Sequence, residues 1–129
     1  MATSGEVVRA YTEAWLAGDL GRVVDLYHPE LVLHYGGSNP LSGEHCGKDA
    51  AIETLLAVQA RTQRVPLQVI DVMESPDHAA AWVRERWVVD GEEIELDRLL
   101  VYRIADGMLA ECWLYDQDQA LVDRVLSAT

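Results

Sequence analysis

The chain has 129 residues, half of them apolar and a quarter charged, which is the mixture of one globular domain and excludes a disordered or repetitive chain. Its 22 acidic and 10 basic residues give a formal net charge of −12, which argues against nucleic acid and anionic membranes as partners. We find no signal-peptide pattern and no apolar run near the roughly 18 residues of a membrane span. We therefore expect a cytoplasmic protein with a single domain over residues 1–129.

The first helix is predicted from residue 5 to 17, where apolar side chains recur at helical spacing. Thr3 and Glu6 have the spacing of a capping box at its start. Gly18 is expected to end it, because glycine adopts the left-handed backbone that commonly follows a helix.

A short second helix is expected next, capped by Asp19, including Tyr27 and stopping at His28-Pro29. Residues 31–35 then predict a strand. A loop over residues 36–43 follows, because that segment is rich in turn-forming residues.

The period of the apolar residues changes after a third predicted helix over residues 50–61. Asp90-Gly91 and Asp106-Gly107 stand between runs rich in strand-forming residues, which is a strong hairpin signal. A last helix is predicted over residues 116–126, with Asp116 and Gln119 as its capping signal. The strands predicted in this half are residues 65–73, 79–89, 93–104 and 108–115.

Helices followed by an antiparallel meander predict an α+β fold in which the helices pack on one face of the sheet. A strongly curved sheet under helices can leave a cavity that is open at one end. Such cavities are the usual sites for small ligands.

The histidines and cysteines indicate neither a metal site nor a disulfide framework. His28, His45 and His78 match no metal-binding spacing, and Cys46 and Cys112 are too isolated to predict more than two reduced thiols. The chain also has no phosphate-binding glycine loop and no nucleophile elbow. We therefore expect no metal and no cofactor.

Four segments spread along the chain share one resemblance. They are Tyr11–Leu20, the strand end His34-Tyr35, the loop Asn39–Gly43 and the segment Tyr102–Gly107. Together they resemble the SnoaL-like branch of the NTF2-like superfamily, which is related to ketosteroid isomerase. The resemblance implies an NTF2-like cone, with N-terminal helices on a curved antiparallel or mixed sheet around a pocket, a C-terminal helix and dimers through the outer sheet face.

The resemblance implies only part of a catalytic site. Tyr11 stands where ketosteroid isomerases place the tyrosine that donates a hydrogen bond to the developing enolate. Their general base falls on Tyr35 and their second acid on Leu100, so steroid isomerisation by that mechanism is not expected. The single acid of SnoaL-type cyclases also falls near Leu100, and the last aspartate of limonene epoxide hydrolases falls near Leu114.

Strand alternation decides which side chains share the pocket face with Leu100, which the resemblance turns inward. The side chains expected with it are Leu96, Arg98, Tyr102, Val83, Glu85, Trp87, Cys112 and Leu114. The opposite face would hold Trp82, Arg84, Arg86, Trp113 and Tyr115. Two tryptophans and a tyrosine would form an exposed apolar patch unless a partner covered them, which favours a homodimer.

We expect Tyr11, His34, Glu85 and Arg98 to line one cavity, and two of these residues are candidates for proton transfer. Glu85 would be desolvated among apolar neighbours on the inner face, which raises a carboxyl pKa. Alternatively it forms a structural ion pair with Arg98, because the Asp90-Gly91 turn places residue 85 opposite about residue 96. His34 could be a general base, or could hold the loop that follows it by hydrogen bonding.

The other candidates are hydrogen-bond donors and pocket walls. Tyr11 and Tyr35 could donate to a substrate oxygen, or could simply satisfy buried hydroxyls. Asn39 is a turn residue whose amide could reach the pocket mouth. The expected substrate-binding residues are Trp15, Asn39, Leu55, Val83, Trp87, Leu100, Tyr102, Cys112 and Leu114.

Three functions are compatible with this pattern. The first is an enzyme of isomerase, cyclase, dehydratase or epoxide hydrolase type, in which Tyr11 and Tyr35 polarise a substrate oxygen and His34 or Glu85 moves the proton. Arg98 would then tune Glu85 or bind a substrate oxygen. The second is a non-catalytic dimer that binds a small molecule in the same pocket. The third is a structural dimer with a filled interior.

Overall fold

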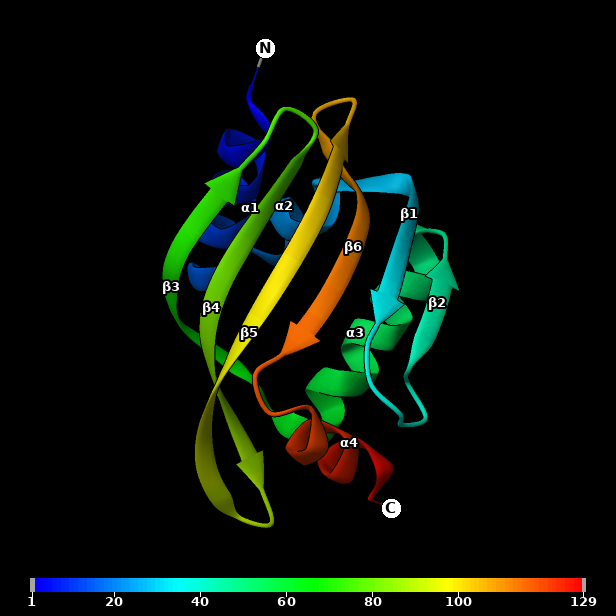
Figure 1. Ribbon diagram of the computed structural model, residues 1–129, viewed down its shortest axis with the longest axis vertical. Coiled ribbons are helices and arrows are strands. Elements are labelled where there is room, and N and C mark those ends of the chain that lie inside the picture. The colour runs from blue at the N-terminus through cyan, green and yellow to red at the C-terminus, as the bar shows by residue number, and fades with distance from the viewer. Residues whose placement is uncertain (1, 129) are drawn as a thin grey trace.

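A curved, mixed sheet with helices on one face forms the structure, a computed structural model that describes residues 2–128 (Figure 1). The strand order is β2-β1-β6-β5-β4-β3, and β1 and β6 form the parallel pair. The helices are α1 (Ser4–Leu16), α2 (Leu20–Asp25), α3 (Lys48–Thr62) and α4 (Gln119–Ser127). The strands are β1 (Tyr27–Tyr35), β2 (Gly43–Cys46), β3 (Val65–Glu74), β4 (His78–Val89), β5 (Glu92–Ala105) and β6 (Met108–Asp116).

This architecture confirms the predicted α+β class, and the capping signals explain the first helices. The Thr3 hydroxyl accepts a hydrogen bond from the Glu6 amide at the start of α1, and the Asp19 carboxylate accepts one from the Arg22 amide in α2. Gly18 separates the two helices with a φ of +73°, which a residue with a side chain rarely adopts.

The second helix is shorter than predicted, because the chain becomes extended earlier. It ends at Asp25, and Tyr27 is already the first residue of β1, opposite Leu109 of β6. The Leu26 carbonyl accepts a hydrogen bond from the Leu109 amide at 2.8 Å. Proline at position 29 also favours extended backbone at His28. A long-range strand contact therefore overrides the helical pattern.

Two further boundaries differ from the sequence prediction. The short edge strand β2 was not predicted, because its four residues show no alternation of apolar and polar side chains. The helix α3 begins at Lys48 instead of residue 50. The last helix is capped by Asp118, whose carboxylate accepts from the Leu121 amide. Asp116 ends β6 instead, and it pairs with a buried arginine described below.

The meander has the predicted register. The two Asp-Gly turns have positive φ at both residues, as tight hairpin turns of this kind require. They place Glu85 opposite Leu96 and Leu100 opposite Leu114. The first of these pairs is the one that counting from the Asp90-Gly91 turn predicted. The inner and outer faces of β4, β5 and β6 therefore carry the expected side chains.

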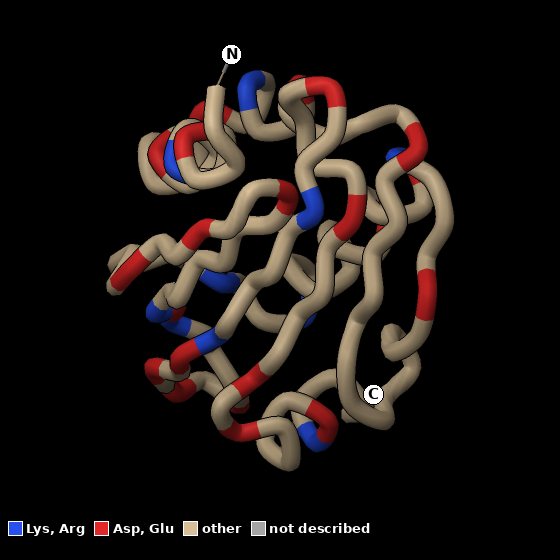
Figure 2. Tube along the Cα trace, turned by 45° about the horizontal axis from the view of Figure 1, so that its top comes forward, with Lys and Arg blue, Asp and Glu red and all other residues tan. Residues whose placement is uncertain are grey.

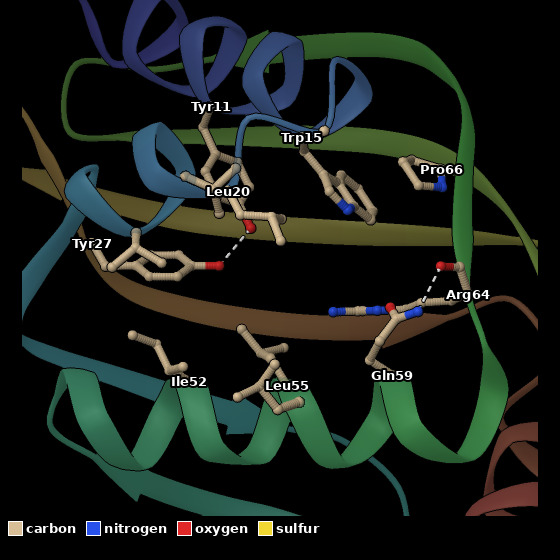
Figure 3. Close-up of a pocket in the computed structure, with 13 residues that line it drawn as sticks. Tyr11, Trp15, Leu20, Tyr27, Ile52, Leu55, Gln59, Arg64 and Pro66 are labelled. Carbon is tan, nitrogen blue, oxygen red and sulfur yellow. Dashed lines mark hydrogen bonds between the residues drawn. The ribbon is translucent and has the colours of Figure 1, made fainter.

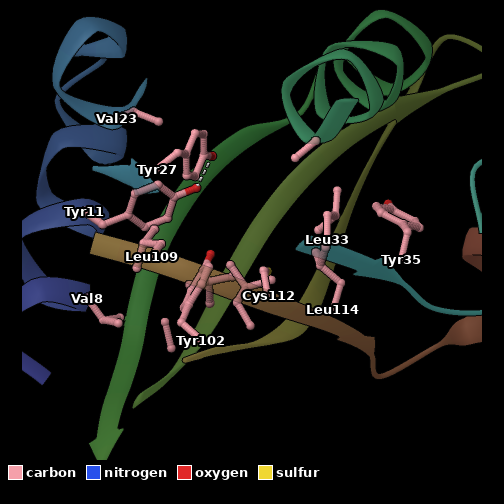
Figure 4. Close-up of a cluster of buried hydrophobic side chains, with 14 of the residues drawn as sticks. Val8, Tyr11, Val23, Tyr27, Leu33, Tyr35, Tyr102, Leu109, Cys112 and Leu114 are labelled. Carbon is pink, nitrogen blue, oxygen red and sulfur yellow. Dashed lines mark hydrogen bonds between the residues drawn. The ribbon is translucent and has the colours of Figure 1, made fainter. Parts of the chain in front are cut away.

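The inner face holds the core, and the outer face remains partly exposed. Apolar side chains from α1, β1, β5 and β6 meet in one buried cluster, with Tyr11, Tyr27 and Tyr102 at one end and Tyr35 at the other (Figure 4). Acidic residues are spread over helices, strands and turns (Figure 2). On the outer face, Trp82 and Tyr115 are 42% and 54% exposed.

No helix within residues 2–128 combines the length and the apolar composition that crossing a bilayer requires.

We predict that the outer face of the sheet pairs with a second copy of the chain. Its charges are balanced locally, because Arg84 pairs with Asp97 at 2.9 Å and Arg103 with Glu111 at 3.2 Å. Two like faces can therefore meet despite the net charge of −12. Light scattering should give the mass of a dimer, and Trp82→Glu should give monomers. Leu20→Glu, on the helical side, is the control that should stay dimeric. A wild-type monomer at high concentration would contradict the prediction.

Candidate functional site

A cavity of about 410 Å³ lies between α1, α2, α3 and the start of β3 (Figure 3). Tyr11 and Trp15 are four residues apart on α1, so both project from one helix face into it. Ile52 and Leu55 of α3 face them across the space. The lining residues are Tyr11, Trp15, Gly18, Leu20, Val23, Val24, Tyr27, Ile52, Leu55, Leu56, Gln59, Arg64 and Pro66.

An inner pocket of about 20 Å³ continues from this cavity toward the sheet. It has room for about one water molecule. Tyr11, Trp15, Tyr27, Leu55 and Arg64 border both spaces. The remaining walls of the inner pocket are Leu31, Leu33, Leu100, Tyr102, Cys112 and Leu114.

A tyrosine pair is the first polar feature of the cavity. The Tyr11 and Tyr27 hydroxyl oxygens are 2.8 Å apart, and the edge of Tyr102 packs on Tyr11 with 5.5 Å between ring centroids. A hydroxyl has one hydrogen to donate, so the bond between Tyr11 and Tyr27 uses one of their two hydrogens. The other is free for an acceptor in the cavity.

These hydroxyls are donors and cannot act as bases near neutral pH. Burial raises the pKa of Tyr11 and raises the pKa values of Tyr27 and Tyr102 well above the ordinary tyrosine value. Burial likewise raises the pKa of the Cys112 thiol to about 12. All four groups therefore keep their protons at neutral pH.

Arg64 is the second polar feature, and the sequence prediction did not include it. Gln63, in the left-handed conformation with φ of 48°, ends α3 and turns the chain so that Arg64 precedes β3. The Gln59 side chain donates a hydrogen bond to the Arg64 carbonyl at 3.1 Å. The guanidinium lies over the Trp15 ring, 5.7 Å from its centroid, and extends into the cavity (Figure 3).

Arg98 forms a separate buried cluster. Its Nε donates to Asp116 at 2.6 Å, one Nη donates to the Tyr35 hydroxyl at 2.8 Å, and the other lies 3.6 Å from Glu85. The Trp87 indole donates to Glu85 at 3.0 Å. Burial alone would lower the pKa of Arg98, but the Glu85 charge, with Tyr35 and Asp116, raises it above its usual value.

This cluster is closed off from the cavity. Glu85 and Arg98 are 0% and 1% exposed, and neither they nor Tyr35 border the two spaces described above. The predicted ion pair between Glu85 and Arg98 is confirmed by the distance of 3.6 Å between their charged groups. The prediction that both line one cavity with Tyr11 is wrong, because the inner sheet face is longer than the cavity and its far end is filled.

His34 lies on the opposite face of the sheet. Its ring stacks on Trp113 with 5.2 Å between centroids, and its Nε2 is 2.5 Å from a Glu111 oxygen. The prediction that His34 faces the cavity is wrong, because alternation along β1 turns Leu33 and Tyr35 inward and His34 outward.

The expected substrate-binding residues divide into three groups. Trp15 and Leu55 line the main cavity. Asn39 lies in a surface loop, where its amide donates to Asp123 at 2.9 Å, and Val83 and Trp87 are fully buried beside the Arg98 cluster. These three do not border either space. The remaining four expected residues line the inner pocket; they are Leu100, Tyr102, Cys112 and Leu114.

Tyr27 and Arg64 are the two hydrogen-bond donors facing the cavity that matter most to the candidate site and that the sequence prediction did not include. The other missed lining residues are Gly18, Leu20, Val23, Val24, Leu31, Leu33, Ile52, Leu56, Gln59 and Pro66. Tyr27 was assigned to a helix, although the proline two residues later was a signal for extended backbone nearby. Arg64 had no such signal, because a basic residue just after a helix is most simply explained by the helix dipole. Only the three-dimensional structure, in which Arg64 lies over Trp15 of α1, reveals its position.

Metal binding has no obvious place in the described chain. Within residues 2–128, no group of three or more His, Cys, Asp or Glu side chains is arranged to hold a metal ion. The cofactor-free site stays a prediction from the sequence.

Comparisons with known proteins agree on the fold. The model of the SnoaL-like domain matches residues 8–112. A Xanthomonas campestris protein of unknown function with a cystatin-like fold is 21% identical, with a TM-score of 0.89 over 98% of this chain and 100% of its own. An NTF2-like protein from Burkholderia pseudomallei is 21% identical, with a TM-score of 0.83 over 99% and 100%.

A third solved structure is that of a proposed polyketide cyclase from Pseudomonas putida. It is 20% identical, with a TM-score of 0.74 and coverage of 100% of both chains. A comparison with curated proteins found no match.

We predict that Glu85→Gln lowers the free energy of unfolding by about 1–3 kcal/mol, because it leaves buried Arg98 with one charged partner fewer. Urea unfolding at pH 7 measures this effect. Glu92→Gln, at an exposed position of the same hairpin, is the matched control and should change little. An unchanged stability of Glu85→Gln would show that the ion pair is not structural.

Proposed function

The chain belongs to the SnoaL-like domain family of NTF2-like folds, and on that premise we propose that it binds a small, apolar, oxygenated molecule between α1, α2 and α3. The observation that supports this most is an apolar cavity whose polar groups are hydrogen-bond donors. The proposal follows the second of the three functions considered from the sequence. A filled interior, the third, does not fit a cavity of about 410 Å³.

The size and the walls of the cavity suit such a ligand. Small-molecule sites commonly enclose about 300–1,000 Å³ and have apolar walls with a few placed polar groups. Leu20 and Leu56 line the cavity, yet they are 66% and 63% exposed. Large apolar side chains at the rim would be covered by a bound apolar molecule, which favours binding through the hydrophobic effect.

The tyrosine pair supplies the orientation of the ligand. The free hydroxyl hydrogen of Tyr11 or Tyr27 can donate to a carbonyl or hydroxyl oxygen of the ligand. The surrounding low dielectric strengthens that bond and penalises a ligand that leaves the hydroxyl without an acceptor. The ligand is therefore expected to carry an oxygen at this end.

The absence of a base favours binding over proton transfer. Among the lining residues of the described chain, no carboxylate and no histidine borders the cavity or the inner pocket. The tyrosines and Cys112 keep their protons at neutral pH. A side chain that accepts a proton from the ligand is thus missing from the site.

Cyclase-type catalysis is the second candidate. Hydroxyl donors and a cation around an apolar space can stabilise the negative oxygen that develops when a carbonyl compound forms an enolate. One neighbour of this fold is a proposed polyketide cyclase. In this chain the proton would have to leave to water or to another group of the substrate.

We predict that 2-acetonaphthone, a flat ketone, binds one molecule per chain in isothermal titration calorimetry. The double variant Tyr11→Phe/Tyr27→Phe removes both hydroxyls that could donate to the ketone. It should weaken binding of the ketone roughly 2- to 10-fold, the contribution of one hydrogen bond, while binding of 2-ethylnaphthalene stays the same. Tyr115→Phe, on the outer face, is the control and should bind both molecules normally.

Leu55→Trp provides an independent check, because the larger side chain should narrow the cavity and weaken binding of both molecules. The proposal is contradicted if 2-acetonaphthone does not bind, or if it binds equally well to Leu55→Trp.

A further inference from the structure

We propose that the ligand of this cavity carries a carboxylate and that Arg64 binds it. This inference rests on the proposed function and specifies its ligand class, an aromatic or otherwise flat apolar acid. It starts from an arginine that points into an apolar space without a partner of opposite charge.

Arg64 differs from the arginines that the fold uses for structure. Arg84 pairs with Asp97, Arg98 with Glu85 and Asp116, and Arg103 with Glu111. Within residues 2–128, no carboxylate lies within ion-pair distance of Arg64, and its buried Nε has no hydrogen-bond partner. Of the half-buried arginines in the described chain, Arg84, Arg86 and Arg103 each pair with one of the 22 acidic residues, and Arg64 does not.

The cation is nonetheless held in place. Gln59 fixes the backbone carbonyl of Arg64 from the last turns of α3, and Trp15 supports one face of the guanidinium at 5.7 Å. The partial desolvation of this charge is unfavourable until an anion neutralises it. A carboxylate is the best match, because the planar guanidinium can donate two parallel hydrogen bonds to its two oxygens.

The two polar features lie at different parts of the cavity. The Tyr11 and Tyr27 hydroxyls meet near the start of β1. Arg64 enters from the end of α3, with apolar side chains of α1 and α3 between it and the tyrosines (Figure 3). A ligand that satisfies both would have a carboxylate at one end and a neutral oxygen at the other, joined by apolar rings.

Calorimetry with naphthalene-2-carboxylate and naphthalene-2-carboxamide at pH 7 tests the proposal, because the two probes differ mainly in charge. Wild type should bind the acid roughly 10- to 100-fold more tightly than the amide, as expected for a hydrogen-bonded charge pair. Arg64→Met should remove this preference and leave amide binding unchanged. Arg64→Lys should retain part of it.

Arg22→Met is the matched control, because it removes one exposed positive charge close to the cavity without touching its lining. It should keep the full preference for the acid. The Nε–H resonance of Arg64, identified by its loss in Arg64→Met, should shift with the acid and not with the amide.

The outcomes separate this inference from the proposed function. Equal binding of both probes to wild type, or a preference that survives in Arg64→Met, would overturn the role of Arg64 and leave a cavity that binds neutral molecules. Failure of both probes to bind would overturn the inference and the proposed function together.

Discussion

The structure depends on one buried cation. Arg98 stands on the inner face of β5 with 1% exposure, and a guanidinium out of water is unfavourable unless carboxylates and hydrogen bonds replace the lost solvent. Glu85 from β4, Asp116 from β6 and Tyr35 from β1 supply them. The cluster therefore connects four strands of the sheet. It also fills one end of the inner face, which leaves the space under α1 and α3 as the open end.

The two ends of the inner face consequently have different roles. At the filled end, the Arg98 cation lies between the carboxylates of Glu85 and Asp116, and none of these three side chains borders the cavity. At the open end, the walls are apolar, the hydroxyls of Tyr11 and Tyr27 are donors, and Arg64 has no carboxylate near it among the described residues. The acid–base residues of the inner face thus stabilise the fold, and the groups at the open end are those that we propose bind an oxygenated ligand.

Sequence reasoning succeeded where structure is local. Alternation and two Asp-Gly turns were enough to place Glu85 opposite Leu96 and to pair it with Arg98, because register follows from turn geometry. It failed where distant segments decide the outcome. Tyr27 joins β1 through its contact with β6, and Asp116 serves Arg98 instead of capping a helix. Arg64 is recognised as a cavity residue only because its guanidinium lies over Trp15 in the folded structure, a contact that no local sequence pattern predicts.

The central claim is that the ligand site is the cavity between the helices and not the Arg98 cluster. A crystal structure of the protein soaked with 2-acetonaphthone tests this most directly. We expect the naphthalene rings to lie between Trp15 and Leu55, with the ketone oxygen within hydrogen-bond distance of the Tyr11 or Tyr27 hydroxyl. A ketone bound beside Glu85 and Arg98, or on the outer face near His34, would contradict it.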